Sequence, residues 1–305
     1  MYSGILIVDK PAGWTSHDVI AKLRGALKQK RIGHGGTLDP MATGVLPVFI
    51  GRGTRAAEFC ENAEKEYIAE LKLGVVTDTQ DITGNVLSEN DVCASYEDLC
   101  AVLPHFMGAQ KQIPPMYSAI KKDGRKLYEL ARKGIDIPRE ARDINISTLE
   151  LLSPPDGEKT DKHIYRLRVA CSKGTYIRTL CHDIGASLGC GGTLSALQRT
   201  RAGVYTIEMS HSLESILNAL SSDVAYKSDE FRRNFLLPVD SIFSDFPAIY
   251  LSESESRKAR NGVAVQAQGH NADGKYRIYS PGSEFLLLGE IKNNKIKTIK
   301  SFFEV

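Results

Sequence analysis

The sequence has no long hydrophobic run and no secretion signal. No apolar stretch approaches the roughly 20 residues that a membrane-spanning helix needs. Residues 1–10 also lack the basic start and the apolar core of a signal peptide. We therefore expect no membrane span and a cytoplasmic location.

The cysteines show no metal-binding pattern, and the chain contains no internal repeat or low-complexity tract. Its six cysteines lack any CxxC or Cys/His spacing that would chelate zinc. In a cytosolic chain of this size we expect them to be reduced and partly buried in the core. The sequence therefore predicts no structural metal.

The composition is that of a globular protein with unevenly distributed charge. A length of 305 residues, 42% of them hydrophobic, predicts one large or two ordinary domains. The net charge is only +2, yet residues 22–31 carry five basic residues and no acidic one, and residues 121–142 carry eight basic against four acidic. Such clusters indicate a polyanionic partner, although charge runs also occur on ordinary solvated faces.

One carboxylate, Asp39, lies in a loop sequence rich in glycine, GHGGTLDPMATG over residues 33–44. Gly33, Gly35 and Gly36 permit backbone angles that are closed to other residues, and Pro40 favours extended backbone at Asp39. An apolar run follows and predicts a strand over Val45–Gly51. The loop is suited to present a reactive carboxylate, and the alternative is an aspartate that closes an Asx turn.

The flanking segments predict regular elements. The run GILIVDK predicts a buried strand over Gly4–Lys10, and Thr15 or Ser16 can cap a helix over residues 17–29. The motif GRGTRA at Gly51–Ala56 matches a loose phosphate-binding fingerprint, but Pro47 should interrupt the preceding strand and no alternating βα units follow. We favour a turn there, with Thr54 and Arg55 facing solvent or a phosphate, and a nucleotide-dependent enzyme remains the alternative. Further strands are predicted at Tyr67–Val75, Ile144–Leu152 and Tyr165–Cys171, and a short helix at Tyr96–Leu103.

Four later segments bear on function. The polar stretch Thr77–Gly84 lacks the ligand run of a calcium loop and predicts a solvated turn. The segment Gln112–Arg142 combines an extended start, a basic turn and tyrosines interleaved with positive charge, which suits contacts to RNA or an ordinary surface excursion. In Ser172–Leu180 a glycine turn precedes Arg178 and a helix, so this arginine can form a structural ion pair or point at a catalytic carboxylate. Beyond residue 247 the pattern predicts a helix followed by short strands, a small β-rich module with basic side chains at Lys292, Lys295, Lys297 and Lys300.

These residues together resemble the bacterial tRNA pseudouridine-55 synthases of the TruB family along nearly the whole chain. The matching stretches, in the order of the family, are GILIVDKPAGWTSHDVIAKLR, IGHGGTLDPMATGVLPVFIG, EYIAELKLG, PPMYSAIKKDGRKLYELARKG and CSKGTYIRTLCHDIG. The C-terminal module resembles a PUA domain. The poorest matches are residues 215–235, to which we assign no role, and residues 154–163, which we expect to vary.

The resemblance implies an α+β chain with the pseudouridine synthase fold, a mixed, mostly antiparallel central sheet with flanking helices. It implies a catalytic domain over residues 1–247 with an RNA-binding insertion at about 110–143, and a PUA-like RNA-binding domain over 248–305. The implied partner is the T stem-loop of tRNA, with no cofactor and no metal. We expect a monomer.

The resemblance also implies roles for individual residues. Asp39 matches the catalytic aspartate, and the substrate-binding matches are His34, Tyr67, Arg178, Leu197 and Lys10. For His34 the alternative is a loop histidine bonded to local backbone, and for Leu197 it is simple core. We expect the RNA backbone to contact Lys121, Lys122, Arg125, Lys126, Tyr128, Arg132 and Arg142.

The implied reaction is isomerisation of uridine 55 by base flipping, cleavage of the N1–C1′ bond and reattachment through C5. An ionised aspartate can attack the sugar or the base, or take a proton from the sugar, and the sequence leaves these routes open. The alternative function is a tRNA-binding folding helper that acts without catalysis.

Overall fold

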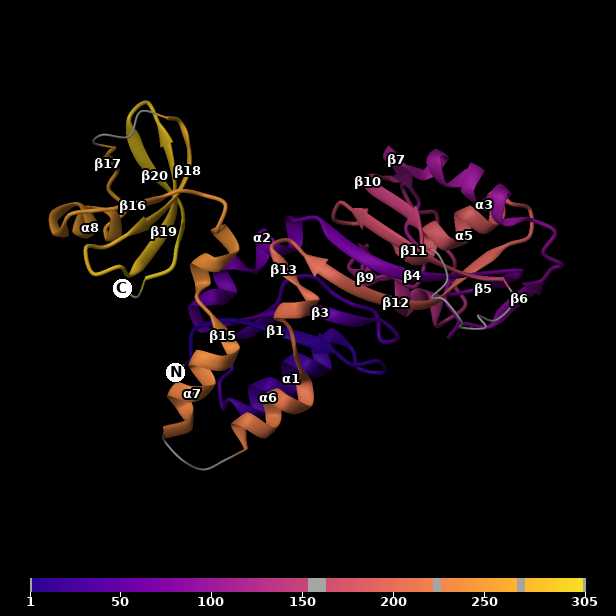
Figure 1. Cartoon of the computed structure of the whole chain (residues 1–305), viewed down its shortest axis with the longest axis horizontal. Helices are drawn as coiled ribbons and strands as arrows, with labels where there is room; N and C mark the ends of the chain where they lie inside the picture. Colours follow the sequence, from indigo (N-terminus) through magenta and orange to yellow (C-terminus); the bar gives the residue numbers. More distant parts are fainter. Residues whose placement is uncertain (1, 153–162, 222–225, 268–271, 304–305) are drawn as a thin grey trace.

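The computed structural model describes residues 2–152, 163–221, 226–267 and 272–303. Most of the chain forms one long sheet of eleven strands, and the C-terminal part forms a second sheet of five (Figure 1). No helix in these described ranges is both long and apolar enough to cross a membrane.

The long sheet is mixed and mostly antiparallel, as predicted. Its strand order is β14 (His211–Ser212), β1 (Gly4–Lys10), β3 (Thr43–Ile50), β12 (Gly192–Ala202), β4 (Lys65–Leu73), β11 (Ile164–Cys171), β10 (Arg142–Leu151) and β7 (Gly108–Gln112), with β13 (Tyr205–Thr206), β15 (Leu236–Leu237) and β2 (Ile32–His34) paired beside it. The β1–β14 and β3–β12 pairs are parallel. Strand β3 runs through Pro47, so the predicted interruption is wrong; the Pro47 carbonyl accepts a hydrogen bond from the Gly35 N–H.

Helices cover the sheet and complete its core. They are α1 (Ser16–Ala26), α2 (Ala57–Asn62), α3 (Tyr96–Val102), α5 (Ile177–Ser187), α6 (Leu213–Leu220) and α7 (Tyr226–Phe235), with short 3-10 turns η2 (Leu103–Phe106), η3 (Ile207–Met209) and η4 (Val239–Phe243). Thr15 caps α1 in a capping box with Asp18, which confirms the predicted helix start. The apolar side of α1 is buried at Val19, Ile20 and Leu23, and Leu27 at its C-cap is buried as well, which gives the spacing of an amphipathic helix.

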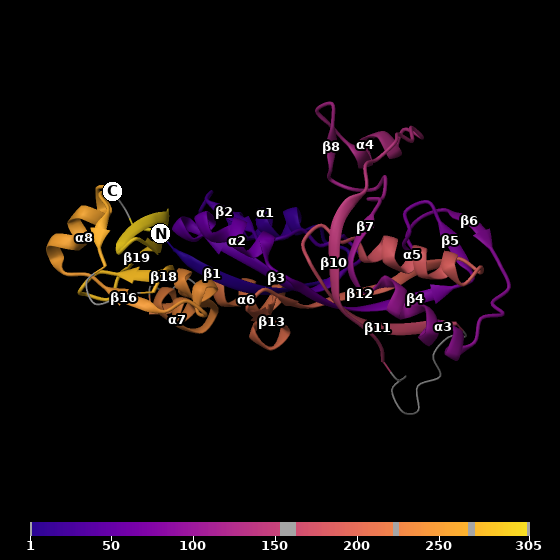
Figure 2. The ribbon, with the colours of Figure 1, turned by 90° about the horizontal axis from the view of Figure 1, so that it is seen from above.

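Two further segments extend from the long sheet. Strands β5 (Val75–Thr77) and β6 (Val86–Glu89) form a hairpin, and the insertion between β7 and β10 contains β8 (Lys121–Lys122), β9 (Arg125–Lys126) and α4 (Leu127–Ala131). Figure 2 shows the insertion standing away from the sheet. A small apolar cluster of its own, Met116, Leu127 and Leu130, packs inside it.

Within the segment without a predicted role, residues 215–235, the described parts lie beside α1, β1 and β15. Phe231 is buried, and its ring meets that of Tyr2 edge-on at 5.4 Å between centroids. The apolar face of α6 is buried at Leu213 and Ile216. The described part of this segment therefore completes the core beside α1 and β1. The segment 154–163, expected to vary, lies outside the described residues except for His163.

The C-terminal sheet has the order β16 (Ala248–Tyr250), β18 (Gly274–Tyr279), β19 (Phe285–Lys292), β20 (Lys295–Ser301) and β17 (Val265–Gln266), with α8 (Glu253–Arg260) packed beside it. The predicted helix and short strands are confirmed. Lys300 does not join an open basic rim, because its Nζ lies 2.6 Å from the Glu58 carboxylate of α2.

The two sheets share a hydrophobic core. Phe243 of η4 lies between them, and its ring is 5.0 Å from that of Phe59 and 5.8 Å from that of Phe302. The same cluster includes Phe49 from β3 and Leu288 from β19. The C-terminal sheet is therefore packed against the long sheet rather than tethered by a linker.

The motif GRGTRA forms the 3-10 turn η1 (Gly51–Ala56) at this junction, and no βαβ unit surrounds it. Arg55 donates to the Ser301 carbonyl at 3.0 Å, and Thr54 accepts a hydrogen bond from Arg31. A Cβ on Gly53 would lie 2.6 Å from the Gly4 carbonyl oxygen. The motif therefore joins the two sheets. The prediction is wrong for Arg55, whose guanidinium bonds the C-terminal sheet instead of a phosphate, while Thr54 stays partly exposed.

Removing the Phe243 ring should destabilise the whole chain. We expect Phe243→Ala to lower the free energy of unfolding by about 3–5 kcal/mol, because the cavity opens between the two sheets. Urea unfolding followed by circular dichroism measures the loss. The control is Leu87→Ala, where the side chain is 66% exposed and the change should stay near about 0.5 kcal/mol. Equal losses in the two variants would contradict a shared core.

Candidate active site

Asp39 lies in the loop between β2 and β3, and its side chain is 38% exposed, so the loop presents this carboxylate as predicted. The ends of the glycine-rich sequence are strands rather than loop. Gly36 has φ +111° and Gly44 has φ +96°, angles that favour glycine, and a Cβ on Gly44 would lie 2.3 Å from the Arg199 carbonyl oxygen. Gly33 lies in β2, and Gly35 is required by close approach to Phe49 rather than by its backbone angle.

Arg178 forms an ion pair with Asp39. Its Nε lies 2.9 Å from Oδ2 of Asp39, and its Nη2 donates to Oδ1 at 3.4 Å. The Arg178 side chain is only 5% exposed, so the arginine of this ion pair is buried while the Asp39 carboxylate is accessible to solvent. Of the two alternatives for Arg178, the structure shows the one in which its guanidinium points at the candidate carboxylate.

Asp81 is the second carboxylate at this arginine, and sequence reasoning missed it. Its Oδ2 lies 3.6 Å from Nη1 of Arg178, and its side chain is 8% exposed. The hydroxyls of Thr79 and Thr83 donate to Oδ1 of Asp81. The prediction of a solvated turn is therefore wrong here, because the β5–β6 turn folds back over Arg178 and buries Asp81. The alternation of small polar residues alone does not reveal this contact.

Backbone carbonyls hold the rest of the Arg178 guanidinium. Nη1 donates to the Thr79 carbonyl and Nη2 to the Tyr117 carbonyl, both at 2.9 Å. Arg178 thus joins α5 to the β5–β6 turn and to the base of the insertion. Gln112, which is buried, bonds both backbone groups of Tyr176 and fixes the turn before α5.

Lys10 is fully buried below the Asp39 loop. Its Nζ donates to the carbonyls of Pro11, Trp14 and Pro40 at 2.7–3.3 Å. Burial lowers the pKa of Lys10 from 10.5 to about 8, and the Asp39 charge opposes this shift. The lysine therefore fixes the backbone directly after Asp39 rather than reaching into the open part of the site.

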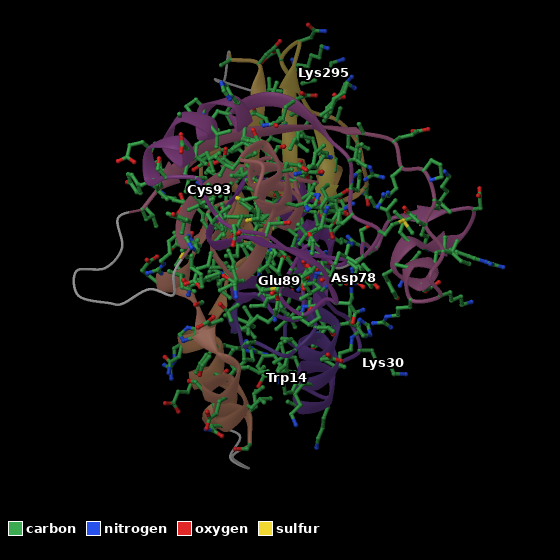
Figure 3. All side chains as sticks on the ribbon, turned by 90° about the vertical axis from the view of Figure 1, so that its right-hand side faces the viewer. Trp14, Lys30, Asp78, Glu89, Cys93 and Lys295 are labelled. Carbon is green, nitrogen blue, oxygen red and sulfur yellow. The ribbon has the colours of Figure 1, made fainter. Side chains whose placement is uncertain are left out.

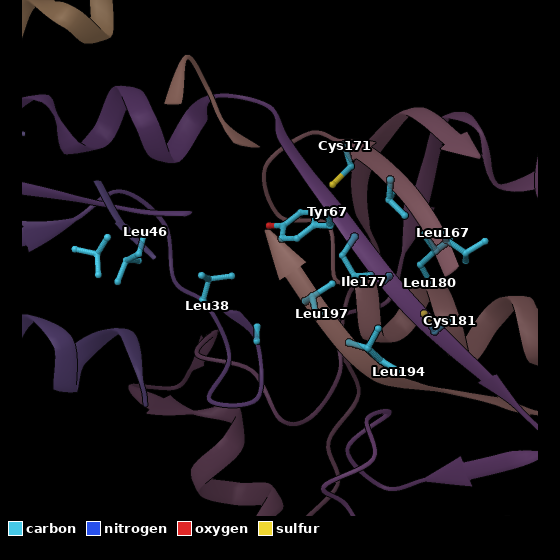
Figure 4. Close-up of a cluster of buried hydrophobic side chains, with 14 of the residues drawn as sticks. Leu38, Leu46, Tyr67, Leu167, Cys171, Ile177, Leu180, Cys181, Leu194 and Leu197 are labelled. Carbon is cyan, nitrogen blue, oxygen red and sulfur yellow. The ribbon is translucent and has the colours of Figure 1, made fainter. Parts of the chain in front are cut away.

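Tyr67 and Leu197 form an apolar wall on neighbouring strands. Tyr67 of β4 pairs with Arg199 of β12, two residues from Leu197, and both apolar side chains are at most 9% exposed. Figure 4 shows the Tyr67 hydroxyl pointing toward the Leu38 side of the cluster, with Leu197 on its flank. Burial raises the pKa of the Tyr67 phenol, so it stays neutral. Leu197 belongs to the main core, as one of its two alternatives has it, and it lies beside Tyr67.

His34 ends strand β2 and is half-buried. Its Nδ1 is buried without a hydrogen-bond partner in the described structure, so the alternative of a histidine bonded through this atom to local backbone is not seen. Burial, with the nearby Arg199 charge, lowers the pKa of His34 and favours the neutral imidazole.

The basic residues of the insertion lie apart from this centre. Lys121, Lys122, Arg125 and Lys126 form the β8–β9 hairpin, whose turn at Asp123–Gly124 has positive φ at both residues. The Tyr128 ring is covered by Lys126 and Arg132, each with its charged group 5.4 Å from the ring centroid. Arg142 instead begins β10, where its charge acts on Tyr176.

Two labelled basic residues outside the insertion lie in different places relative to it. In Figure 3, Lys30 from the first basic cluster points outward on the side where the insertion stands, and Lys295 lies at the far tip of the C-terminal sheet. In the described part of the chain, no three His, Cys, Asp or Glu side chains gather into a group that could hold a metal ion. All six cysteines are free and four of them are buried, as predicted.

Comparison with known families matches the chain from residue 24 onward. Residues 24–177 match the profile described as TruB family pseudouridylate synthase (N terminal domain). Residues 178–244 match the tRNA pseudouridylate synthase B C-terminal domain, and residues 247–299 match Pseudouridine synthase II TruB, C-terminal.

The chain belongs to the TruB family of pseudouridylate synthases.

Relatives in the TruB family match the chain over nearly its full length. The tRNA pseudouridine synthase B of Clostridium kluyveri is 38% identical over 303 residues, which cover 98% of this chain and 99% of the relative. The protein of the same name from Syntrophomonas wolfei is 43% identical, with 97% and 96% covered.

Solved structures agree with the TruB assignment. A chain in the crystal structure of a Cbf5-Nop10-Gar1 complex superposes with a TM-score of 0.73 at 27% identity, covering 98% of this chain and 85% of that one. The predicted pseudouridine synthase fold with a β-rich, PUA-like C-terminal module is confirmed.

The buried Lys10 should titrate separately from the surface lysines. We expect its Nζ to lose a proton near pH 8, while the unfolded chain keeps this proton to about pH 10.5. Between these values the unfolded state binds more protons, so Lys10 makes the free energy of unfolding rise with pH, and Lys10→Met should lose that rise. NMR of isotope-labelled lysine side chains, with Lys10→Met for assignment, measures the midpoint. Titration of every lysine above pH 10 would contradict the burial argument.

Proposed function

We propose that this protein isomerises uridine to pseudouridine at position 55 in the T loop of tRNA, with Asp39 as the catalytic residue. The observation that carries the proposal is the exposed Asp39 carboxylate held by the buried Arg178, next to the apolar wall of Tyr67 and Leu197. The relatives named tRNA pseudouridine synthase B support tRNA as the substrate.

The reaction needs a flipped nucleotide and a dry surface. Extracting the uridine from the stacked loop costs a few kcal/mol, and an aromatic ring with an aliphatic neighbour can offset this by covering the base. We assign this covering to Tyr67 and Leu197. His34, at the end of β2 on the loop that presents Asp39, is assigned to contact the RNA beside the flipped base.

Asp39 must be ionised and fixed to act. A guanidinium 2.9 Å away restricts the rotation of the carboxylate. Asp81 contacts Arg178 from the other side. Because two carboxylates and two carbonyls hold the guanidinium, it should keep its position when the substrate binds. Lys10 fixes the next peptide through the Pro40 carbonyl.

The chemistry conserves redox state, because the N1–C1′ bond breaks and a C5–C1′ bond forms within the same nucleotide. Three routes fit a carboxylate in this position: attack on C1′ of the sugar, attack on the uracil ring, or removal of a sugar proton. Each route requires Asp39 unprotonated at its exposed face. We propose that no cofactor and no metal take part.

The RNA outside the loop should lie along the basic surfaces. We assign the T stem to the insertion, through Lys121, Lys122, Arg125, Lys126, Tyr128 and Arg132, with Arg142 nearer the site. We propose a catalytic domain over residues 1–247 and a PUA-like RNA-binding domain over 248–305; the start of the second sheet at Ala248 supports this division. We further propose that the protein acts as a cytoplasmic monomer.

Changing Asp39 to asparagine should abolish product formation and leave tRNA binding nearly intact. The amide keeps the shape but is neither a base nor a nucleophile. Mapping of pseudouridine in tRNA incubated with purified protein measures the product, and filter binding measures affinity. The control is Asp78→Asn, which should stay active because the Asp78 carboxylate accepts hydrogen bonds from Asn85 rather than from Arg178.

Wild-type turnover by Asp39→Asn would refute the catalytic assignment. The same variant separates catalysis from a tRNA-folding role. If the protein were a folding helper without catalysis, cells that carry Asp39→Asn would show normal tRNA maturation. The wild-type protein would then form no pseudouridine either.

Neutralising the β8–β9 hairpin should weaken tRNA binding and flatten its salt dependence. In Lys121→Gln, Lys122→Gln, Arg125→Gln and Lys126→Gln combined, each lost phosphate contact should reduce the slope of log K against log salt by about 0.7–0.9. Binding titrations at several salt concentrations measure the slope. An unchanged slope would show that the RNA backbone lies elsewhere.

A further inference from the structure

Arg199 is a buried arginine below the Asp39 loop that the proposed mechanism does not use. Its side chain is 1% exposed, which makes it the largest fully buried side chain of the described structure. It lies on β12, paired with Tyr67 of β4 on one side and with Gly44 of β3 on the other. It is therefore at the point where the three central strands meet the loop.

The guanidinium bonds both arms of the loop. Nε donates to the Val45 carbonyl at 2.7 Å, on the strand that follows Asp39. Nη2 donates to the Gly36 carbonyl at 3.1 Å and Nη1 to the Thr37 carbonyl at 3.4 Å, both before Asp39. One rigid planar group thus fixes the distance between the two ends of the segment that carries the catalytic carboxylate.

The backbone is shaped for this contact. Strand β3 approaches β12 so closely at Gly44 that a Cβ there would lie 2.3 Å from the Arg199 carbonyl oxygen, and a Cβ on Gly36 would lie 3.6 Å from Nη1. The closeness of Gly44 and the positive φ at Gly36 and Gly44 turn the carbonyls of the loop inward. The loop therefore surrounds the arginine rather than resting on it.

Arg199 also lacks the partner that a purely structural buried cation normally has. Buried charges in proteins are generally paired with an opposite charge. Within the described residues no carboxylate lies within 4.0 Å of Arg199, in contrast with Arg178 and with Arg201 on the same strand, whose Nη2 is 2.7 Å from Glu64. Its positive charge acts on two groups around the site, because it adds to the effect of burial in lowering the pKa of Lys10 and of His34.

We propose that Arg199 is a positioning residue for Asp39: it closes the catalytic loop through three carbonyls and supplies an unpaired positive charge beneath it. This inference rests on the proposed function of Asp39. The fork sets where the carboxylate stands relative to the flipped uridine, and the charge adds a positive potential beneath the loop.

The test compares three variants with wild type. Arg199→Lys keeps the charge but has one nitrogen in place of three, Arg199→Met keeps neither charge nor donors, and Arg201→Met removes a partly exposed arginine two positions away that contacts Glu64 and Gly203 instead of the loop. Forming the C5–C1′ bond releases the hydrogen on C5, so tritium release from tRNA labelled at C5 of uridine reports turnover. Single-turnover rates at saturating enzyme, the Kd for tRNA and the urea midpoint are measured for each.

We expect Arg199→Met to lower the single-turnover rate about 100-fold with a Kd for tRNA within about twofold of wild type, since a displacement of about 1 Å at a reacting group has an effect of this size. Arg199→Lys should lose less than Arg199→Met but clearly more than Arg201→Met. The NMR titration of His34 should move to higher pH in Arg199→Met and stay near its wild-type midpoint in Arg199→Lys, a change that a loss of packing alone does not produce.

Two results would overturn the inference. One is an Arg199→Lys enzyme as fast as wild type; the other is a loss of rate in both Arg199 variants no larger than that of Arg201→Met at equal folded fraction. If Arg199→Met does not fold, the comparison of Arg199→Lys with Arg201→Met decides. Absence of tritium release from wild type would refute the proposed function itself, which is a different outcome.

Discussion

Asp39 and Arg178 are separated by 139 positions in the chain, and the arrangement of the site depends on the ion pair between them. Strands β3 and β4, each paired with β12, bring the loop after β2 and the start of α5 to one place. The buried Arg178 also contacts Asp81 and donates to the carbonyls of Thr79 and Tyr117. The same side chain therefore holds both the turn after β5 and the base of the insertion.

Buried cations bonded to carbonyl groups recur around this pair. Lys10 bonds two carbonyls before the Asp39 loop and one within it, Arg199 bonds three more, and Lys65 bonds three at the end of α2. Carbonyl partners satisfy the donors without neutralising the charge. The result is a loop whose backbone is fixed from below while its one carboxylate stays at the surface, and a positive region under the position of an anionic reacting group.

The C-terminal sheet is packed against the long sheet that carries this site. Phe243 and Phe302 share a core with strands β1 and β3, and Lys300 pairs with Glu58 across the junction. The C-terminal module is therefore packed directly against the sheet that carries Asp39, whereas the insertion, with a small core of its own, stands away from the sheet. The C-terminal module and the insertion, the two parts proposed to bind RNA, therefore differ in how extensively they pack against the long sheet.

Local patterns were sufficient to predict most elements of the fold and the residue at the centre of the site. The capping box at Thr15, the apolar stripe of α1 and the glycine-rich loop around Asp39 depend on neighbours in the sequence, so periodicity and turn chemistry reveal them. The local pattern left two alternatives for Arg178, and resemblance to the TruB family favoured its pairing with Asp39 and added the roles of Tyr67 and Leu197. Only the tertiary structure decided that Asp81 is buried beside Arg178, that Arg55 binds the C-terminal sheet, and that Arg199 lies inside the loop. These contacts join strands distant in sequence, and an arginine or aspartate in a polar stretch has the same local signature whether it meets water or a buried partner.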